Sequence, residues 1–273
     1  MIPSSFDYRR ASSLDEAITM LVEGGEDAKL MAGGHSLLPL MKLRLASPSV
    51  LVDLGPVREL SYVRDAGDHV AVGALTRHTD VHGSNVARTE VPILAHVAGQ
   101  IGDPQVRHRG TIGGSIAHGD PASDLPAVCL ALRATFVLAG PSGQRLVPAT
   151  DFFTGFLETA IARDEVLTEI RLPKHSATGW SFQKFGLRAQ DWAIVGVAAV
   201  RNGSTGVALV NMSDTPVLAA GVEAAVAAGA TPSEAAAHAS DGLEPPSDVR
   251  SSREYRRHLA SVLVQRALEE AGA

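Results

Sequence analysis

The chain has 273 residues, 45% of them hydrophobic and 20% charged, which is enough to bury a core in one large domain or in two to three small ones. Its 24 Lys and Arg and 30 Asp and Glu give a net charge of −6 with no prominent run of like charges, which argues against nucleic-acid binding, since that requires a basic patch. A single cysteine excludes a disulfide framework and an iron–sulfur cluster held by this chain. Cys129 lies in an apolar run and is interpreted as a core residue.

The first predicted elements form a compact α/β unit. Ser13 and Glu16 make a capping-box pattern before an amphipathic helix that ends at Gly24-Gly25. A strand, a short helix and a second strand follow, predicted over 29–32, 37–45 and 50–54.

The middle of the chain mixes strands with helices and ends at a polar joint over 174–179. Its strands are predicted over 70–73, 135–139, 145–147 and 165–172, and its helices over 92–101 and 125–132. After the joint come three antiparallel strands, predicted over 181–185, 194–201 and 206–212. Three helices follow them, predicted over 219–228, 232–239 and 253–271. The segment 240–252 is expected to be a mobile linker. We therefore predict an α+β fold with two domains, 1–175 (lobes of about 1–55 and 56–175) and 176–273.

Two glycine-rich turns are the main functional signal. One is Ala32-Gly33-Gly34-His35-Ser36 and the other is Thr111-Ile112-Gly113-Gly114-Ser115, and each stands between an apolar run and a helical pattern. Glycine permits a close backbone approach, and successive N–H groups in such a turn form a concavity for an anion. Two such turns indicate a ligand with two linked phosphates, which points to a dinucleotide. A Gly-Gly pair alone is equally a simple tight turn.

Polar residues near these turns leave several roles open. Asp124 can accept a hydrogen bond from a ribose hydroxyl or an adenine amino group, or it can cap the helix that follows, and Asp120 competes for this role. His35 and His118 have no partner at metal-ligand spacing, so no metal site is predicted. The Rossmann fingerprint, the P-loop and the hydrolase nucleophile elbow do not occur.

These motifs together resemble the FAD-binding (medium) subunits of the molybdenum hydroxylase and xanthine dehydrogenase family, and most closely the medium subunits of aerobic carbon monoxide dehydrogenases. The resemblance covers nearly the whole chain and rests on five segments: 6–8, 32–42, 103–107, 110–114 and 119–127. It implies a two-lobed FAD-binding domain of the vanillyl-alcohol-oxidase (PCMH) type. A smaller C-terminal domain of a three-stranded antiparallel sheet plus helices follows.

The resemblance also implies which residues bind FAD. The two turns would hold the pyrophosphate from two sides, Asp124 would contact the ribose or adenine, and the remaining residues would adjoin the isoalloxazine ring. Lys184 would stabilise an anionic reduced flavin, or it is a solvated lysine at a strand end. The implied set is Leu30, Met31, Ala32, Gly33, Gly34, His35, Ser36, Leu37, Ile101, Thr111, Gly113, Gly114, Ser115, Asp124, Ile161, Lys184 and Trp192.

As to function, the resemblance implies an oxidoreductase subunit that takes electrons from an iron–sulfur subunit onto FAD and passes them to an external acceptor, quinone or NAD. The molybdenum cofactor and 2Fe-2S clusters would sit on partner subunits, in a dimer of heterotrimers. No catalytic residue for substrate hydroxylation and no metal ligand is expected in this chain. The sequence shows no signal peptide and no long apolar segment, so we expect a cytoplasmic protein that reaches the inner membrane, if at all, through partners.

Two other functions stay open from the residues alone. One is a self-contained FAD oxidase or dehydrogenase, in which His35 would carry a covalently attached flavin. The other is a nucleotide-holding assembly module without redox activity, with the Ala-rich helices after Ala219 as a docking surface. Flavin absorbance in the purified protein distinguishes these alternatives.

Overall fold

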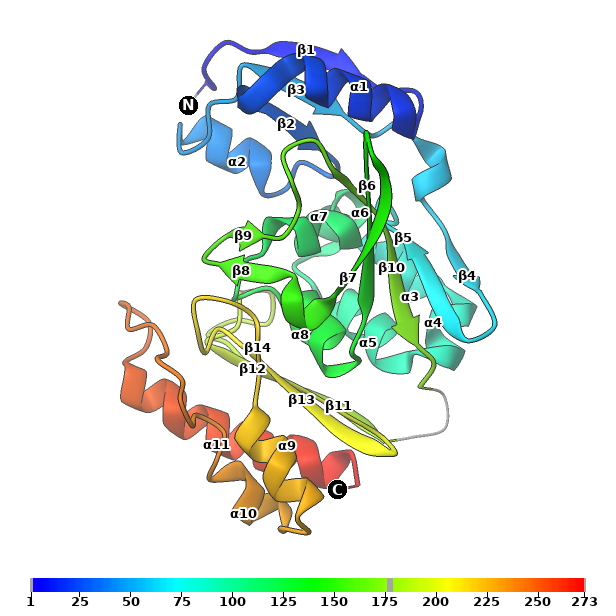
Figure 1. The fold of residues 1–273 in the computed structure, drawn as a ribbon. Coiled ribbons are helices and arrows are strands. Elements are labelled where there is room, and N and C mark those ends of the chain that lie inside the picture. Colours follow the sequence, from blue (N-terminus) through cyan, green and yellow to red (C-terminus); the bar gives the residue numbers. More distant parts are fainter. Residues whose placement is uncertain (1, 176–178, 273) are drawn as a thin grey trace.

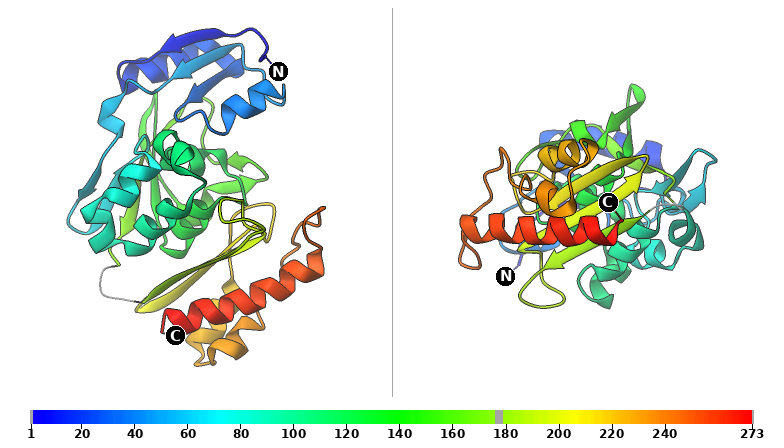
Figure 2. Two further views of the ribbon diagram at one scale, coloured as in Figure 1. Left: turned by 180° about the vertical axis from the view of Figure 1, so that it is seen from behind. Right: turned by 90° about the horizontal axis from the view of Figure 1, so that it is seen from below.

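The computed structural model describes residues 2–175 and 179–272 of the chain. An N-terminal lobe, a central lobe and a C-terminal part follow one another along the molecule (Figure 1). The first helix and the C-terminal helices lie at opposite ends, as the view from behind also shows (Figure 2).

The N-terminal lobe is a parallel sheet of strand order β1-β3-β2 with two helices: β1 (Asp7–Arg10), α1 (Leu14–Gly24), β2 (Ala28–Met31), α2 (Leu37–Lys42) and β3 (Val50–Asp53). Helix α1 buries Ala17 and Leu21 in the core of this lobe. Its predicted cap is half confirmed, because Ser13 Oγ accepts the N–H of Glu16 whereas the Glu16 carboxylate accepts the N–H of Ser12 instead of that of Ser13.

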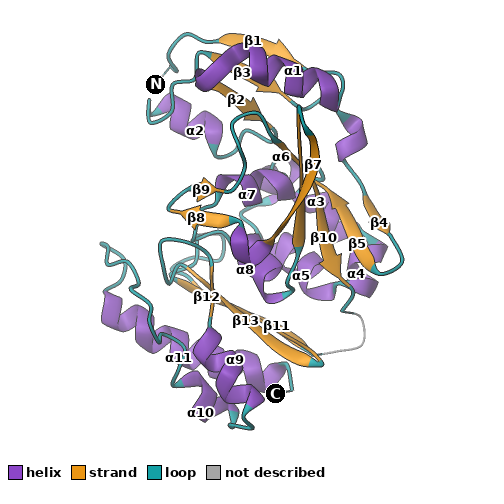
Figure 3. Cartoon of the chain, viewed as in Figure 1, coloured by secondary structure: helices purple, strands orange, loops and turns teal. Residues whose placement is uncertain are grey.

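The central lobe is a five-stranded antiparallel sheet with helices packed beside it (Figure 3). Across the sheet the strands are β4 (Val63–Asp65), β5 (His69–Gly73), β10 (Val166–Pro173), β6 (Thr135–Gly140) and β7 (Gly143–Pro148). The other α-helices and strands are α3 (His78–Gly83), α4 (Asn85–Glu90), α5 (Pro92–Gln100), α6 (Pro104–Arg109), α7 (Ile112–His118), α8 (Asp124–Ala131) and the hairpin β8 (Phe153–Gly155) and β9 (Glu158–Thr159). Every residue of α8 is buried, which explains why its sequence is apolar on all sides.

The C-terminal part is an antiparallel sheet of order β11-β12-β13-β14 with three helices: β11 (Trp180–Phe185), β12 (Val195–Asn202), β13 (Ser204–Val210), β14 (Val217–Leu218), α9 (Ala220–Ala227), α10 (Pro232–Ala236) and α11 (Arg253–Glu270). Helix α11 runs across one face of the sheet, as the view from below shows (Figure 2). Helix α8 of the central lobe packs on β12 and β13.

The strand β12 explains how this sheet is buried on both faces. Successive side chains of a strand point to opposite faces, and Val195 and Val197 lie in the core with α11, whereas Ala198 and Val200 lie in the core with α8. The strand therefore reads as a continuous apolar run. Gly206 on β13 permits the close approach, because a Cβ there would lie 2.1 Å from the carbonyl oxygen of Ala131.

The observed elements agree with the main sequence predictions and extend them. The predicted α+β architecture with a C-terminal antiparallel sheet is confirmed, and the sheet gains a fourth, two-residue strand, β14. The predicted boundary between the two domains adjoins 176–178, which lie outside the described residues. The two predicted domains share one hydrophobic core, which contains residues of α8 from the first domain and of β12 from the second.

The segment 240–252, expected to be mobile, is tied to α11. The guanidinium of Arg256 donates to Asp248 at 2.8 Å, and Arg253 Nε donates to the carbonyl of Pro245 at 3.0 Å. Arg256 is 1% exposed. These contacts fix the segment against the helix, so the expectation of a free linker was wrong.

Candidate functional site

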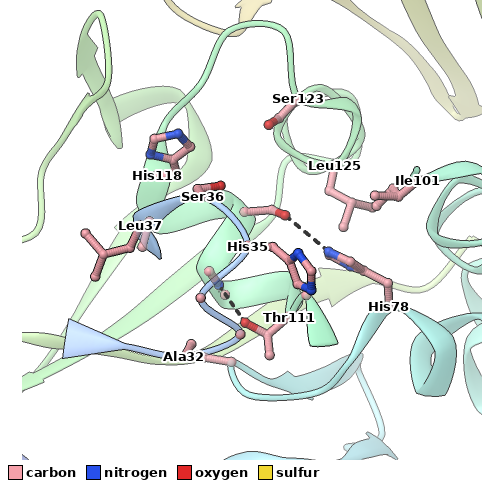
Figure 4. Close-up of a pocket in the computed structure, with 18 of the residues that line it drawn as sticks. Ala32, His35, Ser36, Leu37, His78, Ile101, Thr111, His118, Ser123 and Leu125 are labelled. Carbon is pink, nitrogen blue, oxygen red and sulfur yellow. Dashed lines mark hydrogen bonds between the residues drawn. The ribbon is translucent and has the colours of Figure 1, made fainter. Parts of the chain in front are cut away.

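A cavity of about 660 Å³ lies where the three parts of the chain meet. The segment after β2, the start of α7 and the beginning of α8 all contribute to its wall (Figure 4). Lys184 and Trp192 reach it from the C-terminal part. The structure brings every residue of the predicted FAD-binding set to this one cavity, from Leu30 to Trp192.

The first glycine turn presents free backbone donors. Among the described residues, no acceptor is recorded for the N–H groups of Gly33, Gly34, His35 and Ser36. Gly34 has φ +76°, a left-handed conformation that glycine adopts without strain. A Cβ at Gly33 would lie 2.2 Å from the carbonyl oxygen of Arg109, so this turn packs directly on the end of α6. The turn therefore has the unpaired donors that an anion site needs.

The second glycine segment is built differently from the prediction. It is the first turn of α7, and its N–H groups already have acceptors: Ile112 donates to Thr76 O, Gly113 to Ala74 O and Gly114 to Thr111 Oγ1. The expectation that both turns present bare N–H groups was wrong for this one. Gly113 serves close packing, because a Cβ there would lie 2.5 Å from that of Ala74. The segment contributes shape and the Ser115 hydroxyl to the cavity.

Asp124 and Lys184 form a buried ion pair at the cavity wall. Lys184 Nζ donates to Asp124 Oδ2 at 2.7 Å, and the two side chains are 16% and 5% exposed. The other oxygen, Asp124 Oδ1, is buried without a partner among the described residues. Burial raises the pKa of the Asp124 carboxyl, and the Lys184 ammonium opposes this effect.

These contacts speak against one of the two roles left open for each residue. Asp124 is the first residue of α8, and no capping bond from its side chain is recorded. Lys184 is held by a counter-charge and is not a solvated strand-end lysine.

Apolar and aromatic groups also line the cavity. Trp192 is 51% exposed, and it also lines a second cavity of about 290 Å³. Ile101 and Ile161 are partly buried and pack against the central core. Such a mixture of apolar walls and a few convergent polar groups is typical of a cofactor site.

Sequence reasoning missed His78, which also lines the cavity. It is 2% exposed, its Nε2 lies 3.4 Å from Ser115 Oγ, and its Nδ1 has no partner among the described residues. Burial, with smaller contributions from the nearby charges of His35 and Arg107, lowers the pKa of His78 to about 4. The residue is therefore neutral near pH 7. Nothing in its local sequence sets it apart.

Other chemistries find no support in the described part of the chain. Burial raises the pKa of the Cys129 thiol to about 12, which agrees with its interpretation as a core residue. Over residues 2–175 and 179–272 there is no group of three or more His, Cys, Asp or Glu placed to hold a metal ion. Within those same ranges no helix has the length and apolarity needed to span a bilayer.

The cavity fits a dinucleotide on three structural grounds. Its volume lies within the roughly 300–1,000 Å³ of small-molecule sites. The first turn supplies several unpaired N–H donors for a phosphate. Asp124 Oδ1 supplies a buried acceptor for a hydroxyl or amino group. These features are those of a nucleotide-binding α+β protein, with a cavity lined by residues of two lobes and of the C-terminal part.

Comparisons with known proteins identify the family. Residues 4–175 match the FAD binding domain in molybdopterin dehydrogenase, and residues 180–271 match the CO dehydrogenase flavoprotein C-terminal domain. The chain is 42% identical to the carbon monoxide dehydrogenase medium chain of Hydrogenophaga pseudoflava, over 100% of this chain and 99% of that one. It is 38% identical to the glyceraldehyde dehydrogenase medium chain of Sulfolobus acidocaldarius, over 99% of each chain.

A solved structure agrees with these matches. That of carbon monoxide dehydrogenase from Hydrogenophaga pseudoflava lacking the Mo-pyranopterin moiety superposes with a TM-score of 0.95 at 43% identity, over 100% of this chain and 99% of that chain. The protein belongs to the family of FAD-binding flavoprotein subunits of the molybdenum hydroxylases, and it is an oxidoreductase subunit of the carbon monoxide dehydrogenase and xanthine dehydrogenase type.

Proposed function

We propose that this chain holds FAD in the 660 Å³ cavity, takes electrons from an iron–sulfur subunit and passes them to an external acceptor. The observation that carries the proposal is the first turn, where four consecutive residues, Gly33 to Ser36, have unpaired N–H groups facing no acceptor in the described part of the chain. An anion with several oxygens satisfies such a set of donors at once.

The contacts suggest a role for each part of the cavity. The pyrophosphate would bind to the N–H groups of the first turn, with the Ser115 hydroxyl as a further donor. The buried Asp124 Oδ1 would accept a hydrogen bond from the ribose or adenine. The exposed face of Trp192 would stack on the isoalloxazine ring, with Ile101 and Ile161 as apolar neighbours.

FAD supplies chemistry that side chains lack, because it exchanges electrons either singly or in pairs. The chain's own task is to bind the flavin and to set its electrostatic surroundings. Lys184 would place a positive charge at the site, moderated by its ion pair with Asp124. With one fully buried thiol, this chain has no thiolate set for an iron–sulfur cluster, so the clusters belong to a partner subunit. We assign the molybdenum cofactor to a partner subunit as well.

The complex we propose contains a small iron–sulfur subunit and a large molybdenum subunit, paired as a dimer of heterotrimers in the cytoplasm, with attachment to the inner membrane through partners. Quinone and NAD are the candidate acceptors. Two relatives with similar sequence identity to this chain, 42% and 38%, are medium chains of dehydrogenases named for different substrates, carbon monoxide and glyceraldehyde. Substrate choice therefore belongs to the large subunit and not to this chain.

Reconstitution with FAD tests the proposal. The wild-type protein, alone or with its partners, is expected to bind FAD with an absorbance that dithionite bleaches, and to bind riboflavin far more weakly because riboflavin lacks the pyrophosphate. Gly114→Val should abolish binding, since its side chain would start 2.8 Å from Thr111 Oγ1 and point towards Ala32. The control is Gly83→Val, whose Cβ meets nothing within 4 Å. A colourless wild-type protein, or riboflavin bound as tightly as FAD, refutes the proposal.

A further inference from the structure

His78 is held rigidly against the junction of α6 and α7. Its backbone N–H donates to the carbonyl of Gly110 at 3.1 Å. A Cβ on Gly110 would lie 2.8 Å from Cδ2 and 2.9 Å from Nε2 of the ring, so the imidazole packs flush on that glycine. Nε2 of the ring lies 3.4 Å from Ser115 Oγ, and Figure 4 draws this hydrogen bond at the labelled His78 as a dashed line. The ring therefore has little freedom to turn away from Ser115.

The surroundings of the ring decide which nitrogen carries its proton. A neutral imidazole has one N–H donor and one lone-pair acceptor. Nε2 has a partner in Ser115 Oγ, whereas Nδ1 is buried with none among the described residues. A buried N–H without an acceptor is rarer and costlier than an unused lone pair. The arrangement with the proton on Nε2 is the favourable one, and it makes His78 the donor and Ser115 Oγ the acceptor.

We propose that His78 is a positioning residue for the FAD site, which donates from Nε2 to Ser115 Oγ and so leaves the hydroxyl proton of Ser115 directed at a phosphate oxygen. This inference rests on the proposed function. If Nε2 instead accepted the hydroxyl proton, Ser115 would present only lone pairs to an anion, and that contact is repulsive. The neutral ring contributes orientation without adding a charge to the cavity.

Two variants with opposite hydrogen-bonding geometry test this role. In His78→Gln the amide nitrogen takes the place of Nε2, and in His78→Asn it takes the place of Nδ1. FAD affinity, measured as the Kd by flavin fluorescence with the full chain or its complex, is expected to stay within about threefold of wild type for H78Q. It should fall about tenfold for H78N, since a lost hydrogen bond to a charged group is worth a factor of this order. An equal loss in the two variants, or the reverse order, overturns the proposal.

A double-mutant cycle separates positioning from a general effect on folding. His78→Phe and Ser115→Ala should each weaken FAD binding about tenfold, and the double variant should lose about tenfold rather than a hundredfold, because both changes remove the same contact. Losses that multiply overturn the proposal. The control is His82→Phe, on the same helix, where the ring bonds Ala95 O and does not line the cavity. Thermal unfolding without flavin identifies any variant whose fold is damaged, and the comparison of H78Q with H78N then decides.

The outcome for the wild-type protein keeps the two claims apart. A wild type that binds no FAD contradicts the proposed function. A wild type that binds FAD, with H78N and H78Q equally tight, contradicts only the role of His78.

Discussion

Lys184→Met is expected to destabilise the chain by roughly 3–5 kcal/mol, the cost of leaving one partner of a buried ion pair unpaired. The size follows from burial: the side chains of Lys184 and Asp124 are 16% and 5% exposed, so water solvates the remaining carboxylate far less well than the ammonium did. Asp124 Oδ1 has no partner among the described residues, so the variant leaves the whole carboxylate without one. The two residues belong to β11 and α8, and the variant therefore weakens the contact between the C-terminal part and the central lobe.

Urea unfolding of the flavin-free chain, followed by circular dichroism, measures this cost. The double variant K184M/D124N should recover most of the loss, because no buried charge remains. In K184M the folded-state pKa of Asp124 lies above its unfolded value, so the folded state binds more protons and the deficit should narrow as the pH falls. The matched control is Glu26→Gln, which breaks a pair with Arg163 in which both side chains are over 70% exposed and should cost no more than about 1 kcal/mol. A loss in K184M no larger than in this control refutes the reasoning.

Three further predictions follow from the same contacts. The pKa of His78 is about 4 in the folded chain and about 6.5 in the unfolded one, so between these pH values the unfolded state binds the extra proton. Wild type should therefore lose about 3 kcal/mol of unfolding free energy between pH 6.5 and 4, and H78Q should not show this loss. Unfolding free energies that change equally with pH in the two proteins would contradict this prediction. Gly33→Ala should lower the melting temperature of the flavin-free chain, since its Cβ would lie 2.2 Å from the carbonyl of Arg109, and an unchanged melting temperature would show that the turn relaxes freely. Arg256→Met should destabilise the chain by about 1–3 kcal/mol and open 240–252 to proteases, as its bond to Asp248 is lost; resistance equal to wild type would mean that other contacts hold the segment.

The local part of this fold could be predicted from the sequence because it depends on neighbouring residues. The cap at Ser13, the apolar stripe of α1 and the continuous apolar run of β12 are all short-range signals. The short helices α3, α4 and α6, of six residues each, gave no such signal, since their stability comes from packing and not from their own periodicity.

The site was predictable as a set of residues but not as a set of contacts. Both glycine segments were found, yet glycine has two uses that look the same in sequence: free donors at Gly33 and Gly34, and close packing at Gly113. The pairing of Lys184 with Asp124 joins residues 60 positions apart, on elements whose contact no local pattern encodes.

The close contact at Gly33 links ligand binding to the arrangement of the lobes. The free N–H donors belong to the N-terminal lobe, whereas Ser115, Asp124 and Lys184 belong to the central lobe and the C-terminal part. A ligand that binds both the N–H donors of the N-terminal lobe and the side chains of the other two parts must stabilise the chain against separation of the lobes. The gain in unfolding free energy is about 2.7 kcal/mol at a free ligand concentration 100 times its Kd. FAD should therefore raise the melting temperature, and Gly33→Ala should reduce this gain as well as the stability of the flavin-free chain, because the same glycine holds the donors in place. ADP, which carries the pyrophosphate without the flavin ring, should give part of the gain, and an absence of any shift with ADP would mean that the first turn is not where the phosphates bind.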